Sequence, residues 1–218
     1  MEDRGQWLDI DEPRDVLCSL EECARSLAAL TTDKTAWKWA IISLHSALQG
    51  AMVCHLSGSA QMGAMSKTSV DEWIAWNEKD RRGEIPWIEG PADEWGITSR
   101  RPATNSDVQP RTFLASPPEL FARLRKPQRR IEEGVGAVLT LSGDHAWSFR
   151  KLNSLRNDFV HFSPKGWSIE LSGLPQLFES ILQIMAMIAD DPYPFRHLEE
   201  EEALQLRSSI SELRAALK

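Results

Sequence analysis

The chain lacks most of the features that mark secreted, membrane-bound or zinc-binding proteins. It has only three cysteines in 218 residues and no CxxC pair, so neither a disulfide framework nor a structural zinc site is expected. Its most apolar stretch, residues 36–56, is interrupted by a lysine, a glutamine and two histidines, which argues against a transmembrane helix. The N-terminal residues are acidic and contain no apolar signal region. We therefore expect a cytoplasmic protein without a membrane partner.

Several short motifs that mark enzyme active sites are also missing. The sequence has no GxSxG elbow, no HExxH pair and no glycine-rich phosphate loop after a strand, so the enzyme classes that these motifs identify are not indicated. Carboxylate pairs such as Asp71–Glu72 and Glu132–Glu133 are typical of solvated surface positions. The sequence accordingly predicts neither a cofactor nor a bound metal.

The residues that are present predict a helical protein. Hydrophobic residues make up 42% of the chain and charged residues 26%, an ordinary globular balance. Apolar residues recur every three or four positions, which indicates helices over approximately 13–30, 33–56, 69–82, 118–126, 144–162, 174–189 and 197–217. Residues 128–141 fit either a helix or a strand, because two glycines interrupt an apolar run there. We expect an all-α bundle of about five or six helices.

Residues 57–116 differ in composition from the rest of the chain. Glycine, serine, proline and tryptophan are dispersed through this segment, and 69–82 is its one helical candidate. Irregular segments of this length are uncommon inside compact domains. We interpret the chain as a single helical domain, 1–218, with an insertion at about 57–116.

Tryptophan is unusually frequent, with nine copies against one tyrosine. The pairs Trp37/Trp39 and Trp73/Trp76 could stack on nucleic-acid bases. Packing in a core or at an interface is the favoured interpretation, because large aromatic side chains anchor both.

The charge is distributed unevenly along the chain. The net charge of −7 argues against attraction of nucleic acid by the whole surface. Residues 100–130, however, carry eight basic and two acidic side chains, a net charge of +6. This segment fits either a local phosphate-binding patch or a solvated basic loop.

A polar cluster stands out on the predicted helix 144–162, for which Asp144 is the expected N-cap. At 100° per residue, one side of this helix carries an apolar stripe. The stripe consists of Leu152, Leu155, Phe159 and Phe162. Arg150, Asn157 and His161 fall together on the opposite side, where self-association would cover them.

The spacing within this cluster limits how its members can cooperate. Asn157 and His161 are one turn apart, so the amide oxygen of Asn157 can orient the imidazole. Arg156 lies about 140° round the helix from His161. Both reach one phosphate only if Arg156 bends round, if the helix unwinds, or if a second copy faces the first.

The run Arg156-Asn157-Asp158-Phe159-Val160-His161 resembles the signature of the HEPN superfamily, helical domains named for nucleotide binding in higher eukaryotes and prokaryotes. In that superfamily an arginine, usually followed by a polar residue, precedes a histidine near a helix end. The resemblance implies a homodimer in which two motifs face a shared cleft. It also implies a metal-independent endoribonuclease with an RNA substrate, acting as a toxin or phage-defence effector with a cognate antitoxin or another protein partner.

The residue types suit that chemistry, but a second interpretation stays open. An imidazole can move protons near neutral pH, which fits His161, and a planar guanidinium can stabilise phosphate charge, which fits Arg156. Asn157 would orient the imidazole or contact RNA. The alternative is a non-catalytic helical module that binds nucleotides or a protein partner, in which Arg156 and His161 merely cap helix carbonyls. His45 and Gln49 could line the same cleft, although a satisfied buried histidine is expected at His45.

Overall fold

The computed structural model describes residues 7–8, 10–92, 95–161 and 166–217. Two compact units make up the chain, and each is described separately below. The first combines residues 1–63 with 117–218, and the second covers residues 64–116. The second unit takes up most of the segment that the sequence sets apart as an insertion.

The described part of the chain contains seven α-helices and one two-stranded sheet. The structure is therefore mostly helical, as the periodicity predicts. The first unit contains six of them. They are α1 (Glu12–Ala29), α2 (Ala36–Leu56), α4 (Pro117–Arg125), α5 (Gly143–Val160), α6 (Leu174–Asp190) and α7 (Glu200–Ala216).

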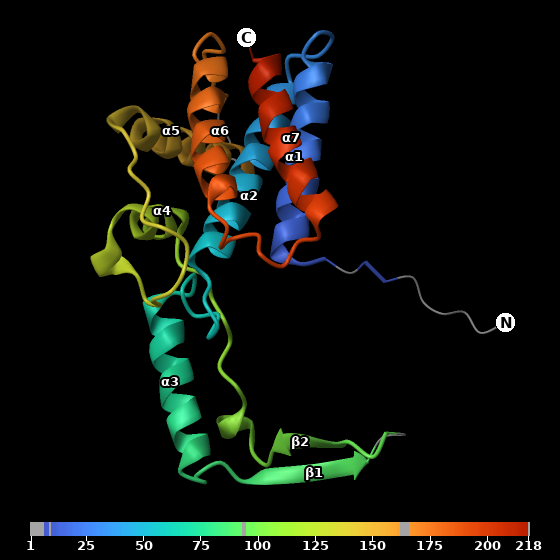
Figure 1. Cartoon of the computed structure of the whole chain (residues 1–218), viewed down its shortest axis with the longest axis vertical. Helices are drawn as coiled ribbons and strands as arrows, with labels where there is room; N and C mark the ends of the chain where they lie inside the picture. The colour runs from blue at the N-terminus through green and yellow to red at the C-terminus, as the bar shows by residue number, and fades with distance from the viewer. Residues whose placement is uncertain (1–6, 9, 93–94, 162–165, 218) are drawn as a thin grey trace, which may run out of the picture. The chain divides into compact units, whose positions relative to one another are not determined.

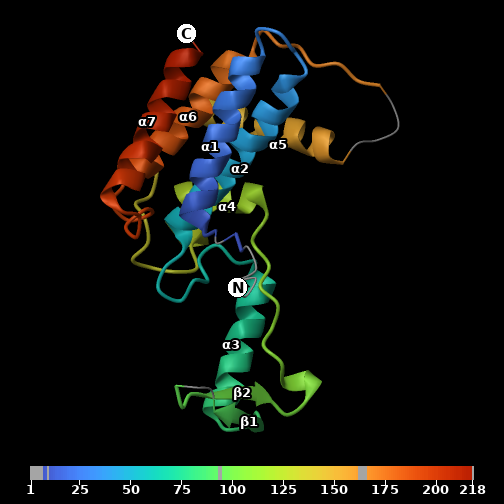
Figure 2. The ribbon, with the colours of Figure 1, turned by 90° about the vertical axis from the view of Figure 1, so that its right-hand side faces the viewer.

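Helices α1, α2, α6 and α7 run alongside one another, and α4 and α5 lie across them (Figure 1). Helix α5 packs against both α2 and α6 (Figure 2). The core is richest along α2 and α6, where Leu44, Leu48, Phe178 and Ile181 are fully buried. By length and composition α2 could cross a membrane, yet 72% of its most apolar window is buried inside the unit, as in a core helix.

The start of α5 differs from the expectation. Ser142, not Asp144, is the N-cap: its hydroxyl accepts a hydrogen bond from the backbone N–H of His145, and the His145 side chain accepts one from the Ser142 N–H. This reciprocal pair satisfies two N–H groups that the first turn leaves without helical partners. Asp144 lies inside the first turn, where its negative charge faces the positive end of the helix.

The end of α5 and the segment before it also differ from simple helix periodicity. Helix α5 ends at Val160 and not at the expected Phe162, which lies outside the described residues. Residues 130–141 form neither helix nor strand, although a single 3-10 turn, Pro127–Arg129, precedes them. Their backbone bonds instead to side chains and to distant backbone, for example from the Leu139 N–H to the Leu124 carbonyl at 2.9 Å.

The second unit combines α3 (Lys67–Arg81) with the antiparallel strands β1 (Trp87–Ala92) and β2 (Thr98–Pro102) and a 3-10 turn, Asn105–Asp107. The rings of Trp76 pack edge-on against Trp73 and Trp87, at centroid distances of 5.9 and 6.1 Å. The indole N–H groups of Trp76 and Trp87 bond to the Asp107 carbonyl and the Asp80 carboxylate, each at 2.8 Å. Tryptophan packing therefore holds this unit together, as expected for the Trp73/Trp76 pair.

Candidate functional site

The last turn of α5 brings Arg156, Asn157 and His161 together. The guanidinium Nη1 of Arg156 donates a hydrogen bond of 3.1 Å to the side-chain oxygen of Asn157. The backbone N–H of His161 donates one of 2.8 Å to the carbonyl of Asn157. The side chain of Asn157 is thus bonded to Arg156 and not to the imidazole of His161, which it meets only through the backbone.

His161 occupies the C-cap position, one residue after the helix ends. Its backbone leaves the helical region, with φ −105° and ψ 60°, and its side chain is exposed. In the described part of the chain, its imidazole makes no hydrogen bond, and none joins it to Arg156. The imidazole therefore does not cap a described helix carbonyl; the cap is made by the backbone N–H alone.

Arg156 is half-buried on the side of α5 that faces α2, beside a buried histidine. That histidine is His45, which is only 3% exposed, and its Nε2 lies 3.1 Å from the side-chain oxygen of Asn153. Burial lowers the pKa of His45, and the positive charge of Arg156 lowers it further, against the opposing effect of the Asn153 hydrogen bond. His45 is therefore a satisfied buried histidine, as expected, and it supports α5 underneath Arg156.

The basic side chains of segment 100–130 are divided between the two units, and three arginines in the helical unit already have partners. In the helical unit, Arg123 is 3% exposed and donates to the Gly63 carbonyl at 2.9 Å. Arg129 pairs with Glu119 at 2.7 Å. Arg130 bonds to the carbonyl of Ala137 at 2.9 Å and to that of Gly136. These three arginines hold loops in place, which the local charge count alone did not indicate.

Glu132 corrects the interpretation of the pair Glu132–Glu133 as two solvated carboxylates. Its carboxylate accepts hydrogen bonds from the backbone N–H groups of Gly58, Ala60 and Gly63, at 2.9, 3.0 and 2.6 Å. Glu133 is exposed, as expected. The donors lie about 70 residues away in the sequence, so no local pattern could have revealed this role.

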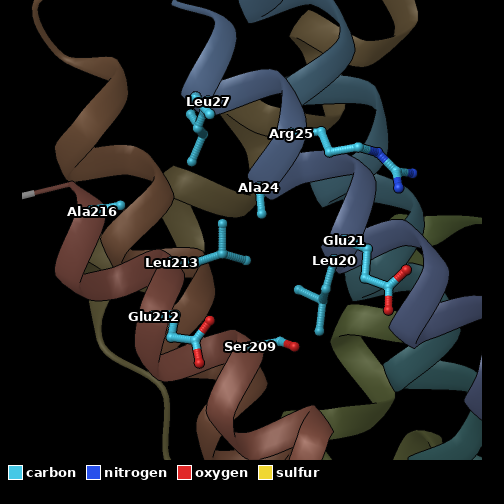
Figure 3. Close-up of a pocket in the computed structure, with 10 residues that line it drawn as sticks. Leu20, Glu21, Ala24, Arg25, Leu27, Ser209, Glu212, Leu213 and Ala216 are labelled. Carbon is cyan, nitrogen blue, oxygen red and sulfur yellow. The ribbon is translucent and has the colours of Figure 1, made fainter.

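Cavities in the helical unit include one beside α1 and one beside α5. A groove of about 610 Å³ separates α1 from α7, and Figure 3 shows Leu20, Leu27 and Leu213 pointing into it. Its two carboxylates, Glu21 and Glu212, already accept hydrogen bonds from Gln205 and Ser208. A second cavity, of about 420 Å³, lies between α5 and the segment leading into α6. Leu155 and Asp158 line it, so it adjoins the turn that carries Arg156 and Asn157.

Among the described residues, no three histidine, cysteine, aspartate or glutamate side chains gather where they could hold a metal ion. Neither a family model, nor a curated protein, nor a solved structure matches this chain.

Proposed function

We propose that the chain is an HEPN-like, metal-independent endoribonuclease that acts as a homodimer. The observation that carries this proposal is the last turn of α5, where the guanidinium of Arg156 bonds to Asn157 and the exposed side chain of His161 follows one turn later. Neither side chain caps a helix carbonyl within the described residues. The arrangement therefore favours a chemical role over the capping role that a non-catalytic module would give them.

The reaction that suits these residues is cleavage of RNA by its own 2′-hydroxyl. The hydroxyl loses its proton and attacks the adjacent phosphorus, the bond to the 5′-oxygen breaks, and that oxygen takes up a proton. His161 serves as the proton carrier, because an imidazole can accept and donate protons near neutral pH. Arg156 stabilises the negative charge that develops on the phosphate oxygens.

Asn157 acts as a positioning residue in this scheme. Its side-chain oxygen already accepts a hydrogen bond from Arg156, so it restricts the direction of the guanidinium. It also leaves its amide N–H groups available for RNA, since no described residue accepts from them. We therefore assign Asn157 to holding Arg156 and contacting the substrate.

A second copy of the chain accounts for the separation between Arg156 and His161. The two side chains share no hydrogen bond among the described residues. In a symmetric dimer, the imidazole of one protomer and the guanidinium of its partner can address the same phosphate. Light scattering should therefore show a dimer at micromolar concentration, and a monomer there would contradict this part of the proposal.

The test compares wild-type protein with Arg156→Ala and His161→Ala in an RNA cleavage assay containing EDTA. We expect cleavage by the wild type and a loss of about 10²–10⁴-fold in rate for His161→Ala. A comparable loss is expected for Arg156→Ala. Arg81→Ala and His197→Ala are matched controls, because both remove exposed side chains that lie outside α5.

Growth arrest on expression would support a toxin or phage-defence effector with a cognate antitoxin or another protein partner. Wild-type protein that leaves cells growing and every tested RNA intact would instead favour the non-catalytic interaction module. Cleavage that is unchanged in His161→Ala would show that the active site lies elsewhere.

A further inference from the structure

The cavity beside α5 presents two tryptophan rings that are not packed into the core. Trp147 on α5 is 54% exposed, and Trp167, in the segment before α6, is 39% exposed. The ring of Trp167 packs against Phe159 with a centroid distance of 4.8 Å and an angle of 59° between the planes. The indole of Trp167 is thus held in place by the ring of Phe159 and still exposes part of its surface to the cavity. Exposed rings of this kind are stacking surfaces for planar ligands.

Charged groups lie along the same face of α5. Trp147, Lys151 and Asp158 all line the cavity and follow helical spacing, so they form one stripe. Both Lys151 and Asp158 are exposed, and neither forms a hydrogen bond or ion pair with any described residue. Glu170, another lining residue, differs because its carboxylate accepts a hydrogen bond of 2.5 Å from Ser172.

The separation between Lys151 and Asp158 suits two different parts of one ligand. They are seven positions apart on the helix, about 10.5 Å along the axis. This distance is too long for an ion pair between them. The cavity therefore has a cationic end at Lys151 and a hydrogen-bond acceptor end at Asp158. A cavity of about 420 Å³ is within the usual size range for small-ligand sites.

We propose that this cavity binds a guanine nucleotide of the RNA strand. The base stacks on Trp167 and presents its edge to Asp158, while Lys151 and Trp147 take the phosphate and the neighbouring nucleotide. Guanine fits because its Watson–Crick edge carries two adjacent N–H donors, which match the two oxygens of a carboxylate. The other three bases do not offer two adjacent donors there.

This inference deepens the proposed ribonuclease function and rests on it for the RNA substrate. Asp158 precedes His161 by three residues in the last turn of α5. Arg156 of the same chain lies about 160° round the helix from Asp158. A guanine held at Asp158 would therefore place its strand near His161, and the guanidinium would come from Arg156 of the partner protomer. The cavity would select the nucleotide next to which the strand is cut.

Titration calorimetry with 5′-GMP, AMP, CMP and UMP tests the cavity without requiring cleavage. We expect GMP to bind at least about tenfold more tightly than the other three nucleotides. Asp158→Asn should abolish this preference, because an amide replaces one acceptor oxygen with a donor. Equal affinity for all four nucleotides, or no binding of GMP at millimolar concentration, would overturn the proposal.

Trp167→Ala and Lys151→Ala test the stacking ring and the phosphate end of the cavity. Trp167→Ala should weaken GMP binding about tenfold, within the range that loss of one stacking ring produces. Trp39→Ala is a matched control, because Trp39 is 55% exposed on α2 and outside the cavity. Lys151→Ala should weaken binding of GMP but not of guanosine, which has no phosphate. Equal effects of Trp167→Ala and Trp39→Ala would contradict the assignment.

Failure of this inference is distinguishable from failure of the proposed function. RNA cleavage that depends on His161, with no binding of GMP, would leave the nuclease intact and remove the guanine site. Binding of GMP that depends on Trp167 and Asp158, without any cleavage, would keep the guanine site and favour the nucleotide-binding module. Circular dichroism of each variant ensures that lost binding does not reflect unfolding.

Discussion

The Nε2 of His45 on α2 donates a hydrogen bond of 3.1 Å to the side-chain oxygen of Asn153 on α5. This bond joins two helices through residues that are 108 positions apart in the sequence. It also sits beneath the turn that carries Arg156, whose charge acts on the same imidazole. The position of the candidate site therefore depends on a buried polar contact with α2.

Removing that contact should destabilise the protein. Asn153→Ala leaves the imidazole of His45 buried without its partner, which costs about 1–3 kcal/mol of unfolding free energy. Urea denaturation measures the change. Asn157→Ala is the control, because Asn157 is exposed and surface substitutions usually change stability by about 0.5 kcal/mol or less. Equal stability of the two variants would show that the His45–Asn153 bond contributes little.

Stability should decrease as the solution is acidified from pH 7.5 to pH 5.5. Burial lowers the pKa of both His45 and His55 in the folded protein. In the unfolded chain a histidine takes up its proton at about pH 6.5. Below that pH the unfolded state therefore binds more protons, and acid favours unfolding.

The size of this effect is limited by the number of buried histidines. Each contributes at most about 1.4 kcal/mol of unfolding free energy per pH unit. Urea denaturation at several pH values gives the slope, and His45→Gln should reduce it by removing one of the two titrating groups. A slope of zero across this range would contradict the buried, neutral state of both histidines.

Glu132→Ala should destabilise the loop after α2. The substitution removes the acceptor of three backbone N–H groups, those of Gly58, Ala60 and Gly63. Hydrogen bonds to charged groups contribute more than neutral ones, so we expect a loss of about 2 kcal/mol or more. The neighbouring Glu133→Ala removes an exposed carboxylate and should be nearly neutral. Thermal unfolding of the two variants measures the difference. Equal losses of stability would contradict a special role for Glu132.

Gly136→Ala should be disruptive because the backbone at this position touches the ring of His55. An added Cβ would lie only 2.4 to 2.7 Å from three ring atoms, and His55 is fully buried. Its Nε2 also bonds to the Ala137 carbonyl at 2.7 Å, so the ring cannot move without losing that contact. We expect a loss of about 1–3 kcal/mol from overpacking.

The control for this substitution is Gly143→Ala. No atom lies within 4 Å of an added Cβ at Gly143, and the residue opens α5. Urea denaturation should show little change or a small gain for Gly143→Ala, because alanine favours the helix more than glycine does. Equal losses at the two positions would rule out the ring contact as the cause.

The sequence by itself determined the helices and which of their faces are apolar. Leu152 and Leu155 are buried and His161 is exposed, as the periodicity of this segment predicts, because a period of 3.6 is a property of neighbouring residues. The run from Arg156 to His161 was likewise readable without the structure. Boundaries were less accurate, since capping by Ser142 and the end of α5 depend on single hydrogen bonds.

Only the tertiary structure decided the roles of Glu132, Arg123 and Arg130. Each side chain bonds to backbone groups of other turns and loops, whereas composition shows only that the residues are charged. The cavity bounded by Trp147 and Trp167 depends on the same kind of information, because its walls come from α5 and from the segment before α6. A local pattern encodes which way a side chain faces, but what it meets there is set by residues that the fold brings from elsewhere in the chain.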